Sequence, residues 1–65
     1  MKNSSPAYFY RDALLNAPYP AGVVYLARHI MYDVALTSDE RSYLMSLANH
    51  IYGGLNGQRD IYAVL

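Results

Sequence analysis

The sequence predicts a small all-α protein, in which three helices and a short fourth C-terminal element form one domain over residues 1–65. Three observations support this prediction. Apolar residues recur every three or four positions within 20–36 and 38–52, as they do along one face of a helix. A proline-rich link precedes the first of these segments, and two glycines follow the second. A chain of 65 residues is also too short for a second domain.

The first helix is expected over residues 6–16. Ser5 can cap its N-terminus, and Pro6 suits the first helical position because its missing N–H has no partner there. Apolar side chains surround most of this helix and leave only Arg11 and Asp12 as clearly solvent-facing positions. Such a helix is expected to be buried on more than one side.

The second helix is expected over residues 20–36. Residues 17–20 form a link, because Pro18 and Pro20 hold the residues before them in extended conformations, and Pro20 then opens the helix. The predicted core stripe comprises Val23, Leu26, Ala27, Ile30 and Val34. A second apolar ridge comprises Val24, Met31 and Ala35.

The third helix carries the strongest local signal. Thr37 and Glu40 match a capping box, and the acidic residues Asp39 and Glu40 favour the positive end of a helix dipole. The helix should then run from residue 38 to about residue 52 and end at Gly53-Gly54. Its predicted core stripe comprises Leu44, Leu47, Ala48 and Ile51.

The C-terminal segment is less well defined by its pattern. Asn56-Gly57 indicates a turn, and residues 58–65 fit either a last helical turn or a short strand. We favour the helical turn, with three side chains against the core: Ile61, Val64 and Leu65. The short link between the second and third helices favours an antiparallel or steeply crossed pair, whose groove the first helix closes.

Composition and charge narrow the possible partners. Five basic and five acidic residues give a net charge of zero, and no basic stripe is present, so nucleic-acid binding is disfavoured. The apolar fraction is 54%, with eight tyrosines, in a chain whose small size limits its core. We therefore expect a homodimer or a higher oligomer.

Nothing in the sequence indicates a membrane or a secretory route. The longest strongly apolar stretch, residues 21–27, is far too short to span a bilayer, and residues 1–5 do not resemble a signal peptide. We therefore expect no membrane association, and the cytoplasm is the default compartment.

No constellation supports catalysis, a cofactor or a metal. His29, Asp33 and His50 do not match a zinc-ligand spacing. Ser42, Ser46 and His50 follow one another at four-residue spacing, but nothing in the pattern supplies an orienting acid or an oxyanion site. The glycines of 53–57 follow a helix and precede no Lys-Ser/Thr pair, so they are typical of a chain reversal, not a phosphate loop. The protein is therefore predicted not to be an enzyme.

One face of the second helix is the candidate partner-binding site. Tyr25, Arg28 and Tyr32 lie away from the predicted core stripe, with His29 and Asp33 beside them. Tyrosine and arginine are the residues that most often anchor protein interfaces. The alternative is that these tyrosines pack internally, against aromatic residues of the first helix or the link after it: Tyr8, Tyr10 or Tyr19.

Residues 37–50 are loosely similar to one helix of the haemolysin-expression-modulating family, which comprises small helical regulators of enterobacteria that bind a larger DNA-binding protein. The similarity rests mostly on the helix cap, and Asn49 stands where that family has an acidic residue. The chain is not assigned to the family.

The combined pattern predicts a non-catalytic protein–protein interaction module that modulates or inhibits a protein partner. Two alternatives remain: a dimeric nucleic-acid-associated regulator, and a structural subunit of a larger assembly.

Overall fold

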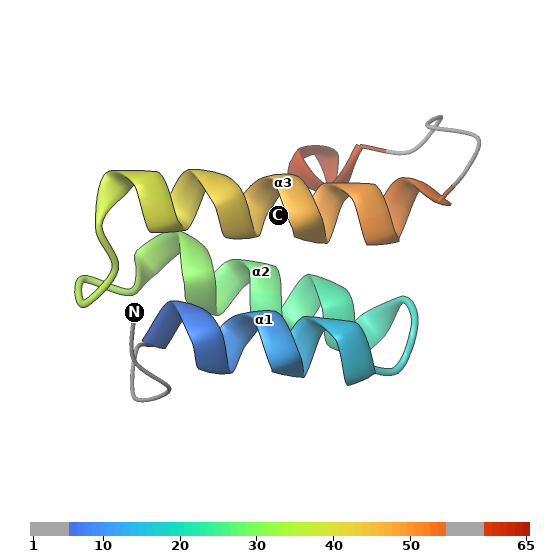
Figure 1. The fold of residues 1–65 in the computed structure, drawn as a ribbon. Coiled ribbons are helices and arrows are strands. Elements are labelled where there is room, and N and C mark those ends of the chain that lie inside the picture. Colours follow the sequence, from blue (N-terminus) through green and yellow to red (C-terminus); the bar gives the residue numbers. More distant parts are fainter. Residues whose placement is uncertain (1–5, 55–59) are drawn as a thin grey trace.

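The computed structural model describes residues 6–54 and 60–65 and shows an all-α arrangement of three helices and a short 3-10 helix. In chain order these elements are α1 (Pro6–Asn16), α2 (Ala21–Tyr32), α3 (Ser38–Gly53) and η2 (Ile61–Ala63). Successive helices run in opposite directions, so that α1 and α3 are roughly parallel and α2 is antiparallel to both (Figure 1). This confirms the predicted fold class.

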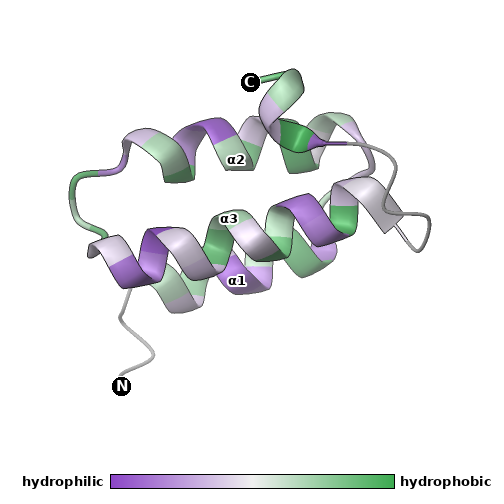
Figure 2. Cartoon of the chain, turned by 90° about the horizontal axis from the view of Figure 1, so that it is seen from above, coloured by the Kyte–Doolittle hydropathy of each residue, from purple (hydrophilic) through white to green (hydrophobic). Residues whose placement is uncertain are grey.

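The core lies where the three helices and η2 meet. α2 supplies three of its buried residues and α3 another three, because these helices carry the clearest three- and four-residue apolar spacing. Figure 2 shows apolar and polar positions alternating around the helices, with η2 lying over α2. The buried core consists of Leu14, Val23, Ala27, Ile30, Leu36, Leu44, Met45, Ala48 and Ile61.

The bounds of α1 agree with the prediction, but its expected burial on several sides is wrong. Leu14 is its only fully buried residue, and Ala7 and Tyr10 pack against the core from the same side. Phe9 is 73% exposed and Leu15 is also exposed. A bundle of three helices covers each helix from one side only, so the remaining apolar side chains of α1 stay in contact with solvent.

The link between α1 and α2 depends on a close approach between Pro18 and Gly22. The N–H of Gly22 donates to the carbonyl oxygen of Pro18 at 2.8 Å. A Cβ atom on residue 22 would lie 2.6 Å from Cδ of Pro18, so only glycine fits there without a shift. The peptide bond between Tyr19 and Pro20 is cis.

α2 ends at Tyr32, four residues earlier than predicted, and this removes Val34 from the core. Val34 is 95% exposed, whereas the predicted stripe places it inside. In a continuing helix the carbonyl oxygen of Ile30 would accept from the N–H of Val34. It accepts instead from Nε of Arg41 at 3.2 Å and from the N–H of Asp33 at 3.3 Å.

Two further contacts hold the chain in this turn. Nη2 of Arg41 donates to the carbonyl oxygen of Asp33, and Oδ1 of Asp33 accepts from the N–H of Ala35 at 2.9 Å. A side chain from α3 therefore satisfies carbonyl groups at the C-terminal end of α2. Leu36 is buried as a result, in the link and not in a helix.

The cap and the end of α3 confirm the prediction. Oγ1 of Thr37 accepts from the N–H of Glu40 at 3.1 Å, and the Glu40 carboxylate accepts from the N–H of Thr37 at 2.8 Å. Gly54 ends the helix with a φ of 66°, a conformation that favours glycine. Within the predicted stripe Leu44 and Ala48 are buried, whereas Leu47 and Ile51 are only partly buried.

The C-terminal element is helical, as favoured, but only part of its predicted packing is present. Ile61 is fully buried, and its N–H donates to Oδ1 of Asn49 at 2.9 Å. Leu65 packs against the core, whereas Val64 is exposed, contrary to the prediction. The predicted cap at Ser5 and the predicted turn at 56–57 lie outside the described residues.

Candidate partner-binding site

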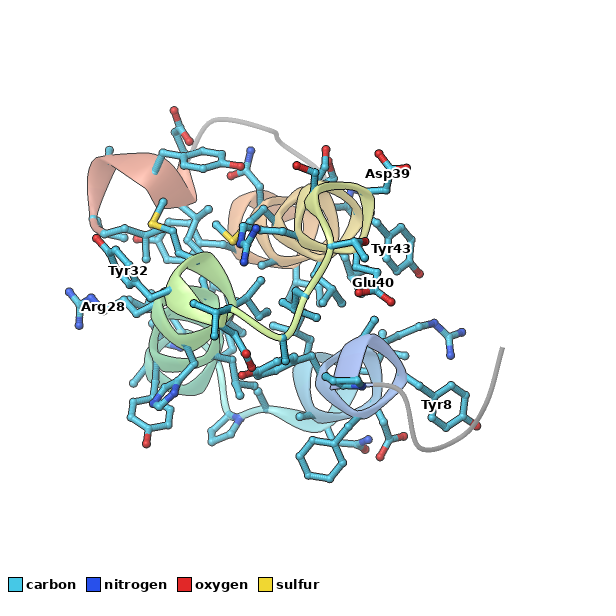
Figure 3. All side chains as sticks on the ribbon, turned by 90° about the vertical axis from the view of Figure 1, so that its left-hand side faces the viewer. Tyr8, Arg28, Tyr32, Asp39, Glu40 and Tyr43 are labelled. Carbon is cyan, nitrogen blue, oxygen red and sulfur yellow. The ribbon has the colours of Figure 1, made fainter. Side chains whose placement is uncertain are left out.

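The five predicted site residues lie on the outer side of α2 and at its C-terminal end. Tyr25 is 62% exposed and Tyr32 is 78% exposed, and Arg28 and His29 are exposed as well. The tyrosines are therefore not packed inside against the aromatic side chains of α1. Figure 3 shows Arg28 and Tyr32 projecting from α2 on the opposite side of the bundle from Tyr8 and Tyr43.

Four of the five predicted residues line one open cavity of about 340 Å³. Its lining consists of Tyr10, Arg28, His29, Tyr32 and Asp33. Tyr25 lies next to this cavity, because its ring centroid is 4.6 Å from that of His29, which is one helical turn away. The structure thus brings the predicted residues together and adds a side chain from α1.

Asp33 forms the polar floor of the site. Its Oδ2 accepts from the hydroxyl of Tyr10 at 2.6 Å, and its Oδ1 accepts from the N–H of Ala35. These two hydrogen bonds, the one from Tyr10 foremost, hold the pKa of the Asp33 carboxyl below its usual value. The same bond to a carboxylate raises the pKa of Tyr10 to about 12.

The cationic part of the site faces outward. Nη2 of Arg28 donates to the carbonyl oxygen of Val64 at 3.1 Å, which holds the arginine against the C-terminal segment. Because an arginine has five N–H donors in a planar fork, this bond leaves the guanidinium with further donors for a ligand. The imidazole ring of His29 supplies a second nitrogen-bearing group on the same exposed surface.

A second cavity, of about 570 Å³, lies beside the first, where the C-terminal half of α1 meets the start of α2. Most of the side chains around it are small or apolar, and Tyr25 stands at its edge. The cavity is lined by Ala13, Asn16, Ala17, Pro18, Ala21, Gly22, Tyr25 and Leu26. Sequence reasoning missed it, although the concentration of alanine and glycine at positions 13–22 was a usable signal for a recess.

Sequence reasoning also missed Tyr10 as a member of the site. Tyr10 lies on the side of α1 that packs against the core, at the spacing of Ala7 and Leu14. Periodicity alone therefore gives it a packing role. Its hydroxyl reaches Asp33 only because α1 and α2 are antiparallel, a juxtaposition of residues 23 positions apart that no local pattern encodes.

The other constellations weighed from the sequence remain separate from this site. Ser42, Ser46 and His50 are exposed on α3. Within residues 6–54 and 60–65, no three histidine, aspartate or glutamate side chains are grouped so that they could hold a metal ion. The helices of the same part of the chain also lack the length and apolar character that crossing a bilayer requires.

Comparisons of the chain with protein-family models, curated proteins and solved structures find no significant match. The site is therefore interpreted from its own geometry and chemistry.

Proposed function

We propose that this protein is a non-catalytic interaction module that modulates a protein partner, and that the partner binds the outer face of α2. One observation carries the proposal: four of the five residues predicted from the sequence line a single open cavity, and the ring of the fifth, Tyr25, contacts that of His29 beside it. Residues that anchor interfaces tend to cluster in this way around a recess that a partner group can fill.

The exposure of the two tyrosines supports this function. Leaving large aromatic rings in water forgoes the hydrophobic stabilisation that a small domain needs. Tyr25 and Tyr32 are both more than half exposed, and they flank Arg28 on successive turns of α2. Each ring keeps an apolar body and a polar tip, the combination that is enriched at protein interfaces.

The test uses site-specific photo-crosslinking in the native host. A photoreactive phenylalanine analogue replaces Tyr32 in one variant and Tyr43 in a matched control, because Tyr43 is also an exposed helical tyrosine but lies on the opposite side of the bundle. The proposal expects one defined protein adduct at position 32 and none at position 43. Equal labelling at both positions, or none at 32, would contradict it.

A pair of double variants tests the energetics of the face. Arg28→Ala with Tyr32→Ala should abolish binding to the crosslinked partner, because truncation of each anchor typically costs about 2 kcal/mol or more. Arg11→Ala with Tyr43→Ala is the control, since it removes the same side-chain types: Arg11 is exposed on α1, and Tyr43 lies on the opposite side of the bundle (Figure 3). Melting temperature is measured on both variants. Intact affinity in a folded Arg28/Tyr32 variant would remove this face from consideration.

A further inference from the structure

The two cavities of the α2 face repeat with a spacing of seven residues. α2 contributes Ala21, Gly22, Tyr25 and Leu26 to the apolar cavity. It contributes Arg28, His29 and Tyr32 to the polar cavity, and Asp33, the first residue after its end, also lines that cavity. Each residue of the second set is seven positions after its counterpart in the first, so the two cavities are two turns, about 10 Å, apart along the helix.

Both cavities also lie on the same side of α2. Seven residues are close to two full turns, so positions seven apart share one face of a helix. α1 borders both cavities, with Ala13 and Asn16 at the apolar one and Tyr10 at the polar one, as its antiparallel direction requires. Tyr25 lines the apolar cavity and His29 lines the polar one, and their tilted rings are in contact, with centroids 4.6 Å apart.

The two cavities differ in the chemistry that they offer. Around the apolar cavity the hydrogen-bonding side chains are Asn16 and the hydroxyl of Tyr25. In the polar cavity both oxygens of Asp33 already accept hydrogen bonds, one from Tyr10 and one from the chain. Of the groups left for a ligand there, Arg28 offers donors alone, whereas the ring of His29 and the hydroxyl of Tyr32 can each donate or accept.

We propose that the partner binds this face as an amphipathic helix lying along α2, with an apolar side chain in the first cavity and a carboxylate seven positions away in the second. The proposal rests on the proposed function and names the chemistry of the partner. A single helix matches the seven-residue repeat, because its own side chains recur on one face at that spacing. The carboxylate matches the outward-facing guanidinium of Arg28, since arginine forks bind carboxylates in pairs of hydrogen bonds.

Synthetic helical peptides provide the probe. One peptide carries leucine and, seven positions later, glutamate, in an alanine- and glutamine-rich background blocked at both ends; a second carries the two residues in the reverse order. One of the two should bind and shift the backbone amide resonances of Gly22, Tyr25 and His29 but not of Tyr43. Binding of neither peptide, or shifts centred on Tyr43, would overturn the proposal.

Three matched controls test the two contacts. Replacing the peptide's glutamate with glutamine should weaken binding about tenfold, the usual worth of a charge-assisted hydrogen bond. Moving the glutamate two positions closer to the leucine places it on another face and should weaken binding as much. Ala21→Leu in the protein, at an exposed position of the first turn of α2, fills the apolar cavity and should also reduce affinity.

A double-mutant cycle shows whether Arg28 meets the carboxylate directly. Arg28→Gln should weaken binding of the glutamate peptide about tenfold. It should hardly change binding of the glutamine peptide, because the interaction between the arginine and a carboxylate is already absent in that complex. Arg11→Gln, a cation removed from α1, should change neither. Equal effects of Arg28→Gln on both peptides would overturn the pairing.

The outcomes also separate this proposal from the proposed function. A host protein crosslinked at position 32, with neither peptide binding, overturns the helical carboxylate partner and leaves the interaction face standing. Loss of both the crosslink and peptide binding overturns the two proposals together. Tyr25 and Tyr32 amide shifts that change with protein concentration alone would identify a second copy of the chain as the occupant, and would overturn the proposal of a different partner.

Discussion

Because α2 ends early, two aliphatic residues that the sequence pattern places in the core are expected to contribute very differently to stability. Val34 and Leu44 both belong to predicted core stripes, yet Val34 is 95% exposed and Leu44 is fully buried. Replacing each with alanine and comparing the two losses in the free energy of unfolding therefore tests whether α2 ends at the turn that Asp33 and Arg41 hold. The comparison is internal, because both variants are read in the same protein under the same conditions.

Leu44→Ala should cost about 2–5 kcal/mol. The substitution removes three buried carbon atoms of the side chain, and each contributes about 0.8 kcal/mol when it is transferred out of water. The cavity that remains adds to the loss. A chain of 65 residues has a total stability on the order of 3–10 kcal/mol, so this variant loses a large share of it. Leu47→Ala should cost less, roughly 1–2 kcal/mol, because Leu47 is only partly buried.

Val34→Ala should change stability by no more than about 0.5 kcal/mol, as is usual for exposed positions. The assay is urea denaturation followed by far-ultraviolet circular dichroism, with the free energy of unfolding taken from the midpoint and slope. If Val34→Ala costs as much as Leu44→Ala, α2 continues through residue 34 and the account of its end is wrong. An unchanged midpoint for Leu44→Ala would refute the location of the core.

Further expectations concern single contacts. The pKa of Tyr10 is raised in the folded state from 10.0 to about 12. The stability that comes from its bond to Asp33 is therefore complete below pH 10 and is lost as the pH rises towards 12. Tyr10→Phe should remove this pH dependence of the free energy of unfolding, together with the tyrosinate absorbance step at the highest pH. Thr37→Ala should cost about 1 kcal/mol in denaturation, through loss of the cap of α3. Gly22→Ala should cost about 1–3 kcal/mol by the same assay, because its Cβ would clash with Pro18. Sedimentation at micromolar concentration should show a dimer or higher species if the exposed aromatic faces self-associate, and a clean monomer would contradict that expectation.

Part of the candidate site could be predicted because it lies within one helix. Tyr25, Arg28 and Tyr32 are placed on a common face by helical periodicity alone, and their separation from the buried Val23, Ala27 and Ile30 follows from the same rule. The cavity could not be predicted, because its floor joins Asp33 to Tyr10 across two helices. The second cavity also needs both helices, since small residues make a recess only when larger neighbours surround them.

The sequence by itself determined the elements whose signals are local. The capping box at Thr37 and Glu40, the proline at the start of α1 and the glycine at position 54 act through neighbouring backbone groups, so the beginnings and ends that they set agree with the structure. The periodic stripe of α2 likewise identified three of its buried residues.

Only the tertiary structure decided where α2 ends and which apolar residues are left outside. The end of α2 depends on Arg41, whose guanidinium reaches back from α3 to carbonyl groups that the helix would otherwise use. The exposure of Phe9, Leu15 and Val64 reflects the limited area that three helices and one short turn can cover. The hydrophobic pattern of the sequence indicates which side chains favour burial. The number of side chains that are buried depends on how much surface the packed neighbours can enclose.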